Sequence, residues 1–340
     1  MLIDTGCATA YLSRVAAYKR IAEETRRVTI TGTRQTRSVE TLTSTLREVP
    51  IGYNRGVRLP WWLKMAARLV ASRLPLPRIA AGLVSSHGET NLDRLIVLFE
   101  TKLLLYQSLS GHRPHTYLEL GPGASVARAL VAARPGIYRI WLIDAGNFAR
   151  RDLAYYHDIA ASLTTRGLTV PDLSECRNLD DVLTACRATY LTGGLSSLRR
   201  IEDNCIDLII SEAVLEHLPR HEFPGFMIEF QRLLAPGGVA LHGVDLDDHI
   251  DGGLNQLRFS RDFWERELLR RSGFYTNRLS RSDMIRHAQA AGLTIGEYYR
   301  LEWCEPPIER DSVHPDLRGW RDSDLKIRSF GLALQSQLGG

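Results

Sequence analysis

Residues 117–125, Tyr-Leu-Glu-Leu-Gly-Pro-Gly-Ala-Ser, constrain the fold of this chain more than any other stretch. The apolar start is typical of a buried parallel strand, Gly121 and Gly123 predict a tight turn, and residues 124–133 have a helical pattern. Glycine lets the backbone take positive φ and approach a ligand closely. The segment therefore predicts a nucleotide-type site at the carboxyl edge of a parallel sheet, although a plain strand-to-helix turn has the same pattern.

Two details narrow the ligand. A dinucleotide-binding turn needs a small residue three positions after its second glycine, where this chain has the branched Val126. Glu119 stands two residues before the first glycine, and the arrangement Glu-x-Gly-x-Gly-x-Ser resembles the first motif of class I S-adenosylmethionine-dependent methyltransferases. In that family the turn lies against the methionine end of the cofactor and the acid supports the loop. The resemblance assigns Glu119, Gly121, Gly123 and Ser125 to cofactor binding.

Asp144 ends the next predicted strand, 21 residues after Gly123. A carboxylate on a rigid strand end can accept hydrogen bonds from both ribose hydroxyls of a cofactor. Because Ala-Gly-Asn follows, Asp144 could instead cap a helix. Its position relative to the glycine turn favours cofactor binding.

Two later segments resemble the same family. Residues 203–218 end in Leu-Glu-His-Leu, like the fourth strand and loop of these enzymes, and residues 232–238, Arg-Leu-Leu-Ala-Pro-Gly-Gly, resemble the turn into their fifth strand. With the glycine turn, these motifs cover about 117–244 in the family's order. The resemblance adds four cofactor-binding residues: Gly193, Ser211, Glu212 and Ala213. It places Glu216 and His217 at helical positions, where a structural role is more common than the alternative, catalysis.

Alternating strands and helices predict an α/β fold with a parallel sheet covered on both faces. The resemblance implies a Rossmann-like, doubly wound, seven-stranded sheet, mostly parallel with an antiparallel last strand. We expect the strands at 117–120, 138–143, 189–191, 206–211, 239–244, 294–303 and 327–335, and a helix at 282–291. The methyltransferase domain is predicted at 111–340, with a substrate-side insertion at 245–280, and residues 1–110 form a helical, basic N-terminal extension or lid.

The extension carries 16 Lys and Arg against 8 Asp and Glu. Within it, the run from Pro60 predicts an amphipathic helix with Trp61, Met65 and Leu69 on one face. Such a basic helix could contact a membrane surface peripherally, or it could pack its apolar stripe on the main domain.

Composition bounds the remaining possibilities. No apolar run reaches about 18 residues, and the start lacks the pattern of a signal peptide. Five scattered cysteines without a C-x-x-C pair indicate a reducing compartment, so we expect a cytoplasmic protein. The net charge of +4, without a basic stripe interleaved with aromatics, predicts no nucleic-acid partner.

The stretch after the fifth strand crowds four acids and a histidine into seven residues, where an acceptor pocket would open. Histidine is the side chain whose usual pKa suits a general base for methyl transfer to oxygen, which makes His249 the candidate. Asp245 or Asp247 could orient it or bind sugar hydroxyls. A plain polar loop is the alternative. The spacing could also hold a divalent cation, but the sequence offers no third ligand, so we predict no metal site.

The predicted function is methyl transfer from S-adenosylmethionine, which leaves S-adenosylhomocysteine, to a small-molecule acceptor. Residues 189–292 resemble a group of bacterial methyltransferases of glycan or natural-product pathways, which favours O-methylation of a sugar, glycan precursor or other small hydroxylated metabolite. Aromatic residues of the insertion could form a sugar platform: Phe259, Trp264, Phe274 and Tyr275. The alternatives are a carboxylate, amine or lipid acceptor, or a non-catalytic scaffold that binds the cofactor. The sequence leaves the oligomeric state open.

Overall fold

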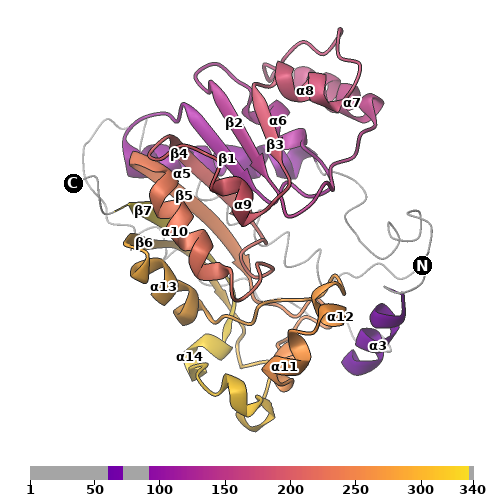
Figure 1. The fold of residues 1–340 in the computed structure, drawn as a ribbon, viewed down its shortest axis with the longest axis vertical. Coiled ribbons are helices and arrows are strands. Elements are labelled where there is room, and N and C mark those ends of the chain that lie inside the picture. The colour runs from indigo at the N-terminus through magenta and orange to yellow at the C-terminus, as the bar shows by residue number, and fades with distance from the viewer. Residues whose placement is uncertain (1–59, 72–91, 337–340) are drawn as a thin grey trace.

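The computed structural model describes residues 60–71 and 92–336 (Figure 1). The rest of the predicted N-terminal extension lies outside these described residues.

A seven-stranded sheet with the order β3-β2-β1-β4-β5-β7-β6 forms the centre of the molecule. The pairs β1–β2, β1–β4, β2–β3 and β4–β5 are parallel, and β7 is antiparallel to both of its neighbours. The predicted α/β, Rossmann-like class with an antiparallel last strand is therefore confirmed. The strands are β1 Thr116–Leu120, β2 Arg139–Ile143, β3 Ala188–Leu191, β4 Ile206–Glu212, β5 Leu234–Asp245, β6 Leu293–Glu302 and β7 Ile327–Ser336.

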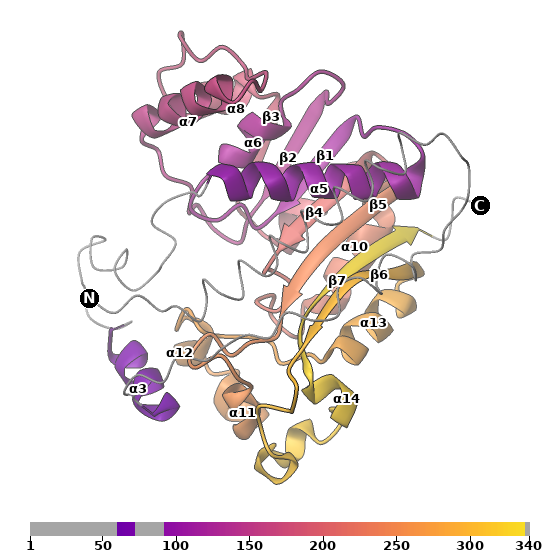
Figure 2. The same ribbon diagram turned by 180° about the vertical axis from the view of Figure 1, so that it is seen from behind.

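Helices cover both faces of the sheet (Figures 1 and 2). One apolar core lies between the sheet and α5 Leu92–Ser110, α6 Ala127–Ala132, α7 Leu153–Thr165 and α8 Leu179–Ala185. The core on the opposite face includes residues of α9 Leu195–Leu198, α10 Phe223–Leu233, α13 Arg281–Ala290 and α14 Asp322–Leu325. Short helical turns complete the described part: η2 Asn255–Arg258, α11 Arg261–Trp264, α12 Glu267–Arg270, η3 Arg310–Ser312 and η4 Pro315–Leu317.

Three local expectations are wrong. The helix after the glycine turn begins at Ala127 rather than at residue 124, since the Ser125 hydroxyl accepts the Ala127 N–H before the first helical turn. Strand β5 begins at Leu234 and includes the Pro-Gly-Gly segment that we expected to precede it. Glu216 and His217 lie in a turn after β4 and not in a helix.

The two described helices of the N-terminal region pack in different places. Helix α5 buries Phe99 and Tyr106 in the core of the sheet. Helix α3, Trp61–Ala71, lies beside the insertion, where its stripe of Trp61, Met65 and Leu69 packs against a cluster around Trp264 (Figure 2). The apolar face of α3 therefore packs on the main domain, which was one of the two alternatives for this helix. No helix within the described ranges is both long and apolar enough to cross a membrane.

The insertion has an apolar core of its own. Trp264 and Phe274 are fully buried, and the Trp264 indole N–H donates to the Thr276 carbonyl at 2.8 Å. Phe259 stacks on Trp264 with ring centroids 5.5 Å apart. The expected sugar platform is therefore wrong for these rings, because their faces are used in packing.

Candidate functional site

The two glycines of the turn differ in their surroundings, and only Gly123 has open space beside it. Gly121 has φ of +74°, donates its N–H to the Ile143 carbonyl at 2.8 Å, and would bring a Cβ within 2.5 Å of the Val214 side chain. Gly123 has φ of +67°, but a Cβ there would meet nothing within 4 Å. The protein itself requires glycine at 121, whereas Gly123 exposes its backbone to a space that a ligand could fill.

Asp144 connects the end of β2 to this turn. Its carboxylate accepts the Gly123 N–H at 2.8 Å and the Ala145 N–H at 2.7 Å. Burial raises the pKa of Asp144, and these two hydrogen bonds partly offset that shift. Helix α7 takes its N-cap from Asp152, so the helix-cap alternative for Asp144 is wrong. Each carboxylate oxygen has a further lone pair, which suits the predicted contact with ribose hydroxyls.

Glu119 and Ser125 hold the turn from its two sides. Glu119 is buried and forms an ion pair with Arg128 of α6. Burial raises the pKa of Glu119, against the opposing charge of Arg128. The Ser125 hydroxyl accepts from the Tyr155 hydroxyl at 3.0 Å as well as from α6. The Glu119 carboxylate therefore ties β1 to α6, and cofactor binding by Glu119 and Ser125 stays a prediction.

The loop after β3 also reaches Asp144. Gly193 donates its N–H to the Ser197 hydroxyl at 2.9 Å, and Gly194 donates to the backbone carbonyl of Asp144 at 2.8 Å. The ends of β2 and β3 are thereby joined. Gly193 lies at the expected adenine side of the turn, and its contact with a cofactor stays a prediction.

The three predicted residues at the end of β4 have partners within the protein. The buried Ser211 hydroxyl lies 2.7 Å from Nδ1 of His242. The Glu212 carboxylate lies 2.6 Å from Nζ of the fully buried Lys102. Ala213 adopts φ of +53° and donates its N–H to the Gly243 carbonyl at 2.9 Å. Cofactor binding by these three residues stays a prediction.

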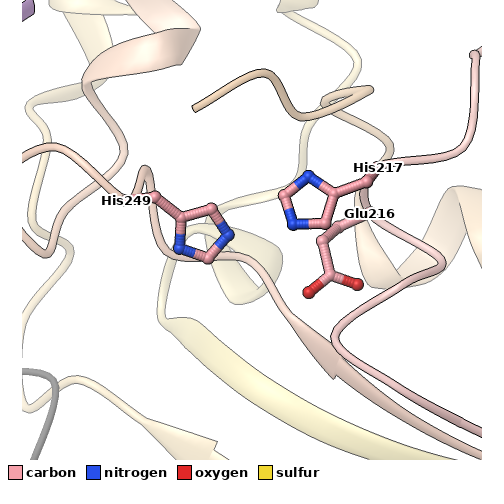
Figure 3. Close-up of side chains that lie close together, drawn as sticks. All are labelled: Glu216, His217 and His249. Carbon is pink, nitrogen blue, oxygen red and sulfur yellow. The ribbon is translucent and has the colours of Figure 1, made fainter. Parts of the chain in front are cut away.

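A second group of polar side chains lies beyond the ends of β4 and β5. Glu216, His217 and His249 point toward one another, with one potential ligand atom from each within 4.8 Å of the others (Figure 3). The two imidazole rings have centroids 5.1 Å apart. Oε1 of Glu216 accepts the Asp245 N–H at 3.0 Å, and Nδ1 of His217 lies 2.6 Å from the Tyr275 carbonyl oxygen.

The acids around His249 have separate roles. Asp247 accepts from Arg328 at 3.2 Å, and burial together with the charge of Asp245 raises the pKa of Asp247 to about 7. Burial also acts to raise the pKa of Asp248, but hydrogen bonds from its neighbours outweigh it and lower that pKa. Asp248 accepts backbone N–H groups of Ile250, Asp251, Gly252 and Asn255 and the Asn255 side-chain amide.

The structure brings predicted His249 together with two residues that we expected to be structural. His249 is 32 positions after His217 in the chain, and their proximity follows from the pairing of β4 with β5. The Leu-Glu-His pattern gave a signal for two members of the group. Lys102 was missed, because a lysine in an apolar helix is usually exposed at its end.

Comparisons with known proteins give a methyltransferase match. Residues 155–242 match the family model described as a methyltransferase domain. No curated protein matches the chain.

The solved structures with partial similarity include methyltransferases whose names give different acceptors. An arsenic(III) S-adenosylmethionine methyltransferase from Chlamydomonas reinhardtii has 21% identity, with 65% of this chain and 64% of that chain covered and a TM-score of 0.36. This chain thus spans less than two thirds of that protein. An O-methyltransferase family protein from Burkholderia thailandensis has 14% identity, coverage of 81% and 68%, and a TM-score of 0.37. The N-methyltransferase NodS from Bradyrhizobium japonicum has 16% identity, coverage of 73% and 98%, and a TM-score of 0.34.

Proposed function

We propose that this chain, a class I S-adenosylmethionine-dependent methyltransferase, methylates an oxygen of a sugar, glycan precursor or other small hydroxylated metabolite. Its class follows from the matched methyltransferase domain and from the order of the sheet with its antiparallel β7. The observation that supports a hydroxylated acceptor is the polar group of Glu216, His217 and His249 at the carboxyl ends of β4 and β5.

The residues at the ends of β1 and β2 fit the cofactor. The backbone of Gly123 faces open space, since an added Cβ would meet nothing within 4 Å, and Asp144 offers carboxylate lone pairs beside it. When bound, S-adenosylmethionine supplies a methyl group on a sulfonium sulfur, which keeps the electron pair of the broken bond as S-adenosylhomocysteine forms. The chain must then position an acceptor oxygen and let its proton leave.

His249 is the residue that we assign to the acceptor hydroxyl. Its imidazole lies in the loop after β5, and without a bound cation its lone pair can accept the hydroxyl proton. Asp245 and Asp247 shape its surroundings, since the Asp245 carboxylate accepts the Asp247 N–H at 3.2 Å. Besides this contact with the hydroxyl, the rest of the acceptor molecule needs a binding site next to the sulfonium.

Cofactor binding is tested best at Gly123. Gly121→Val is a poor test, because Val214 already occupies the space. In Gly123→Asn a side chain would enter the open space, and Asn is among the residues that tolerate positive φ. The matched control is Gly167→Asn, at another open glycine with φ of +77°. Isothermal titration should show S-adenosylmethionine binding to wild type and the control and a large loss in Gly123→Asn. Equal binding by both variants would contradict the site.

The acceptor is tested by S-adenosylhomocysteine release with a panel of glycosides, nucleotide sugars, amines, carboxylates and lipid vesicles. Vesicles belong in the panel because α3 exposes Trp62 and Val70, which could contact a membrane surface. We expect turnover with a hydroxylated acceptor. Turnover with amines or lipids alone would replace the proposed acceptor class. Cofactor binding without any turnover would favour a scaffold.

A further inference from the structure

We propose that Glu216, His217 and His249 form a binding site for a divalent transition-metal ion. Their potential ligand atoms lie within 4.8 Å of one another (Figure 3). Ligands bound tetrahedrally at about 2.1 Å from a Zn²⁺-sized ion lie about 3.4 Å apart. The widest separation would therefore have to shrink by up to about 1.4 Å, shared between two side chains, to close the set around an ion.

The hydrogen bond of His217 orients it for coordination. Nδ1 lies 2.6 Å from the carbonyl oxygen of Tyr275, and a carbonyl oxygen can only accept. Nδ1 must therefore carry the proton, so the neutral ring has its lone pair on Nε2. Histidine ligands of metals usually donate their other N–H to a carbonyl or carboxylate in this way, which fixes the tautomer and the ring orientation.

The other two ligands also come from ordered backbone. The Glu216 carboxylate is held at Oε1 by the Asp245 N–H, at 3.0 Å. His249 lies in a left-handed conformation, with φ of +53°, inside the loop that Asp248 organises through its hydrogen bonds. Glu216 is buried, whereas His249 keeps partial exposure, so the group borders solvent on one side.

The composition of the site selects the kind of metal. Imidazole nitrogen suits Zn²⁺, Fe²⁺, Co²⁺ and Ni²⁺, and an all-oxygen set would be expected for Mg²⁺ or Ca²⁺. Three protein ligands leave at least one coordination position for an outside oxygen. This part of the inference rests on the proposed function: the open position would bind an oxygen of the methyl acceptor and so orient it.

Coordination changes the role of His249. The lone pair with which its imidazole was expected to accept a proton would be bound to the ion. His249 would then hold the ion that positions the acceptor oxygen. The sequence offered no third ligand among Asp245, Asp247 and His249, and the turn after β4 supplies two ligands instead.

Metal binding is tested without cofactor or acceptor, with Co²⁺ as a probe that absorbs visible light when protein ligands coordinate it. Three single variants remove one ligand each: Glu216→Gln, His217→Asn and His249→Asn. Asn can keep a donor near the position of Nδ1 at 217, and it tolerates the positive φ at 249. His221→Asn is the control, because His221 lies beside Glu222 on the surface, with 3.6 Å between its Nε2 and a carboxylate oxygen of Glu222.

Wild type and His221→Asn should bind one Co²⁺ per chain, displaceable by Zn²⁺, and the three ligand variants should bind it at least roughly tenfold more weakly. Circular dichroism must show that the compared variants are folded. If His217→Asn does not fold, the test uses His249→Asn. No saturable binding by wild type, or equal binding by folded His249→Asn, would overturn the site.

The acceptor role has separate measurements. S-adenosylmethionine binding should persist after a chelator has removed the metal, while turnover should fall and return when Zn²⁺ or Co²⁺ is added. Turnover that is unaffected by the chelator would remove the acceptor role and leave the proposed methyltransferase function intact. A metal site that binds Co²⁺ in a chain without any turnover would instead leave the site standing and contradict the proposed function.

Discussion

The buried pair of Lys102 and Glu212 joins α5 to the strand that carries the predicted cofactor loop. Nζ of Lys102 lies 2.6 Å from the Glu212 carboxylate and also donates to the Tyr298 hydroxyl. The lysine side chain is fully buried and the Glu212 side chain is 12% exposed. Burial lowers the pKa of Lys102, and the carboxylate opposes that shift.

Replacing Lys102 with Met should cost about 3–5 kcal/mol, because it leaves the charge of Glu212 buried without its partner. The double variant Lys102→Met/Glu212→Gln should recover part of this loss, since it removes both charges from the interior. The matched control is Arg166→Met, which breaks an exposed pair with Asp93, at 3.1 Å. Exposed pairs contribute about 0–1 kcal/mol.

Urea unfolding followed by circular dichroism measures the free energy of unfolding for all four proteins. The expected loss in Lys102→Met corresponds to a fall in melting temperature of roughly 10 °C. A cost for Lys102→Met no greater than that for Arg166→Met would refute the reasoning, because the pair would then be no more important than a surface contact. A double variant less stable than Lys102→Met would refute the electrostatic part of the argument alone.

Two further predictions follow from carboxylate and imidazole groups at the sheet. Asp144→Asn should weaken S-adenosylmethionine binding roughly ten- to a hundredfold, because it removes a charged hydrogen-bond acceptor. The control Asp152→Asn keeps an N-cap for α7 and should bind the cofactor like wild type. Isothermal titration measures both affinities. Burial lowers the pKa of His242 from 6.5 to about 3. Between pH 6.5 and pH 3 the unfolded chain therefore binds a proton at His242 that the folded chain does not bind. Stability should be full above about pH 6.5 and fall by about 1.4 kcal/mol per unit as the pH drops toward 3. A fall of the same slope in His242→Asn between pH 6.5 and 5 would contradict this.

The sheet could be predicted because its signals are local. The apolar runs of the strands and the glycines after β1 depend on neighbours in sequence, and six of the seven strands begin within two residues of their expected starts. Asp144 could be predicted for the same reason, since it follows the end of β2 directly. The hydrogen bond that its carboxylate accepts from the Gly123 N–H depends on the turn folding back and was not predictable from spacing.

The misses have a common physical cause. Lys102 acts through Glu212, 110 positions later, and nothing near Lys102 in the sequence distinguishes it from a lysine at a helix surface. The sequence pattern of the aromatic residues in the insertion fits a ligand platform and an apolar core equally well. Only the packing of α3 and the insertion around Trp264 decides between these two interpretations.

His217 illustrates how much of the proposed acceptor site depends on the insertion. The Leu-Glu-His pattern places Glu216 and His217 after β4, but their orientation comes from elsewhere. The carbonyl that fixes the His217 tautomer belongs to Tyr275, and the N–H that holds Glu216 belongs to Asp245. Both partners lie in residues 245–280, as does His249. A chain with the same pattern and a different segment after β5 would have the same two side chains without this orientation. The orientation of these two side chains is therefore set by the insertion, and the motif supplies only their position after β4.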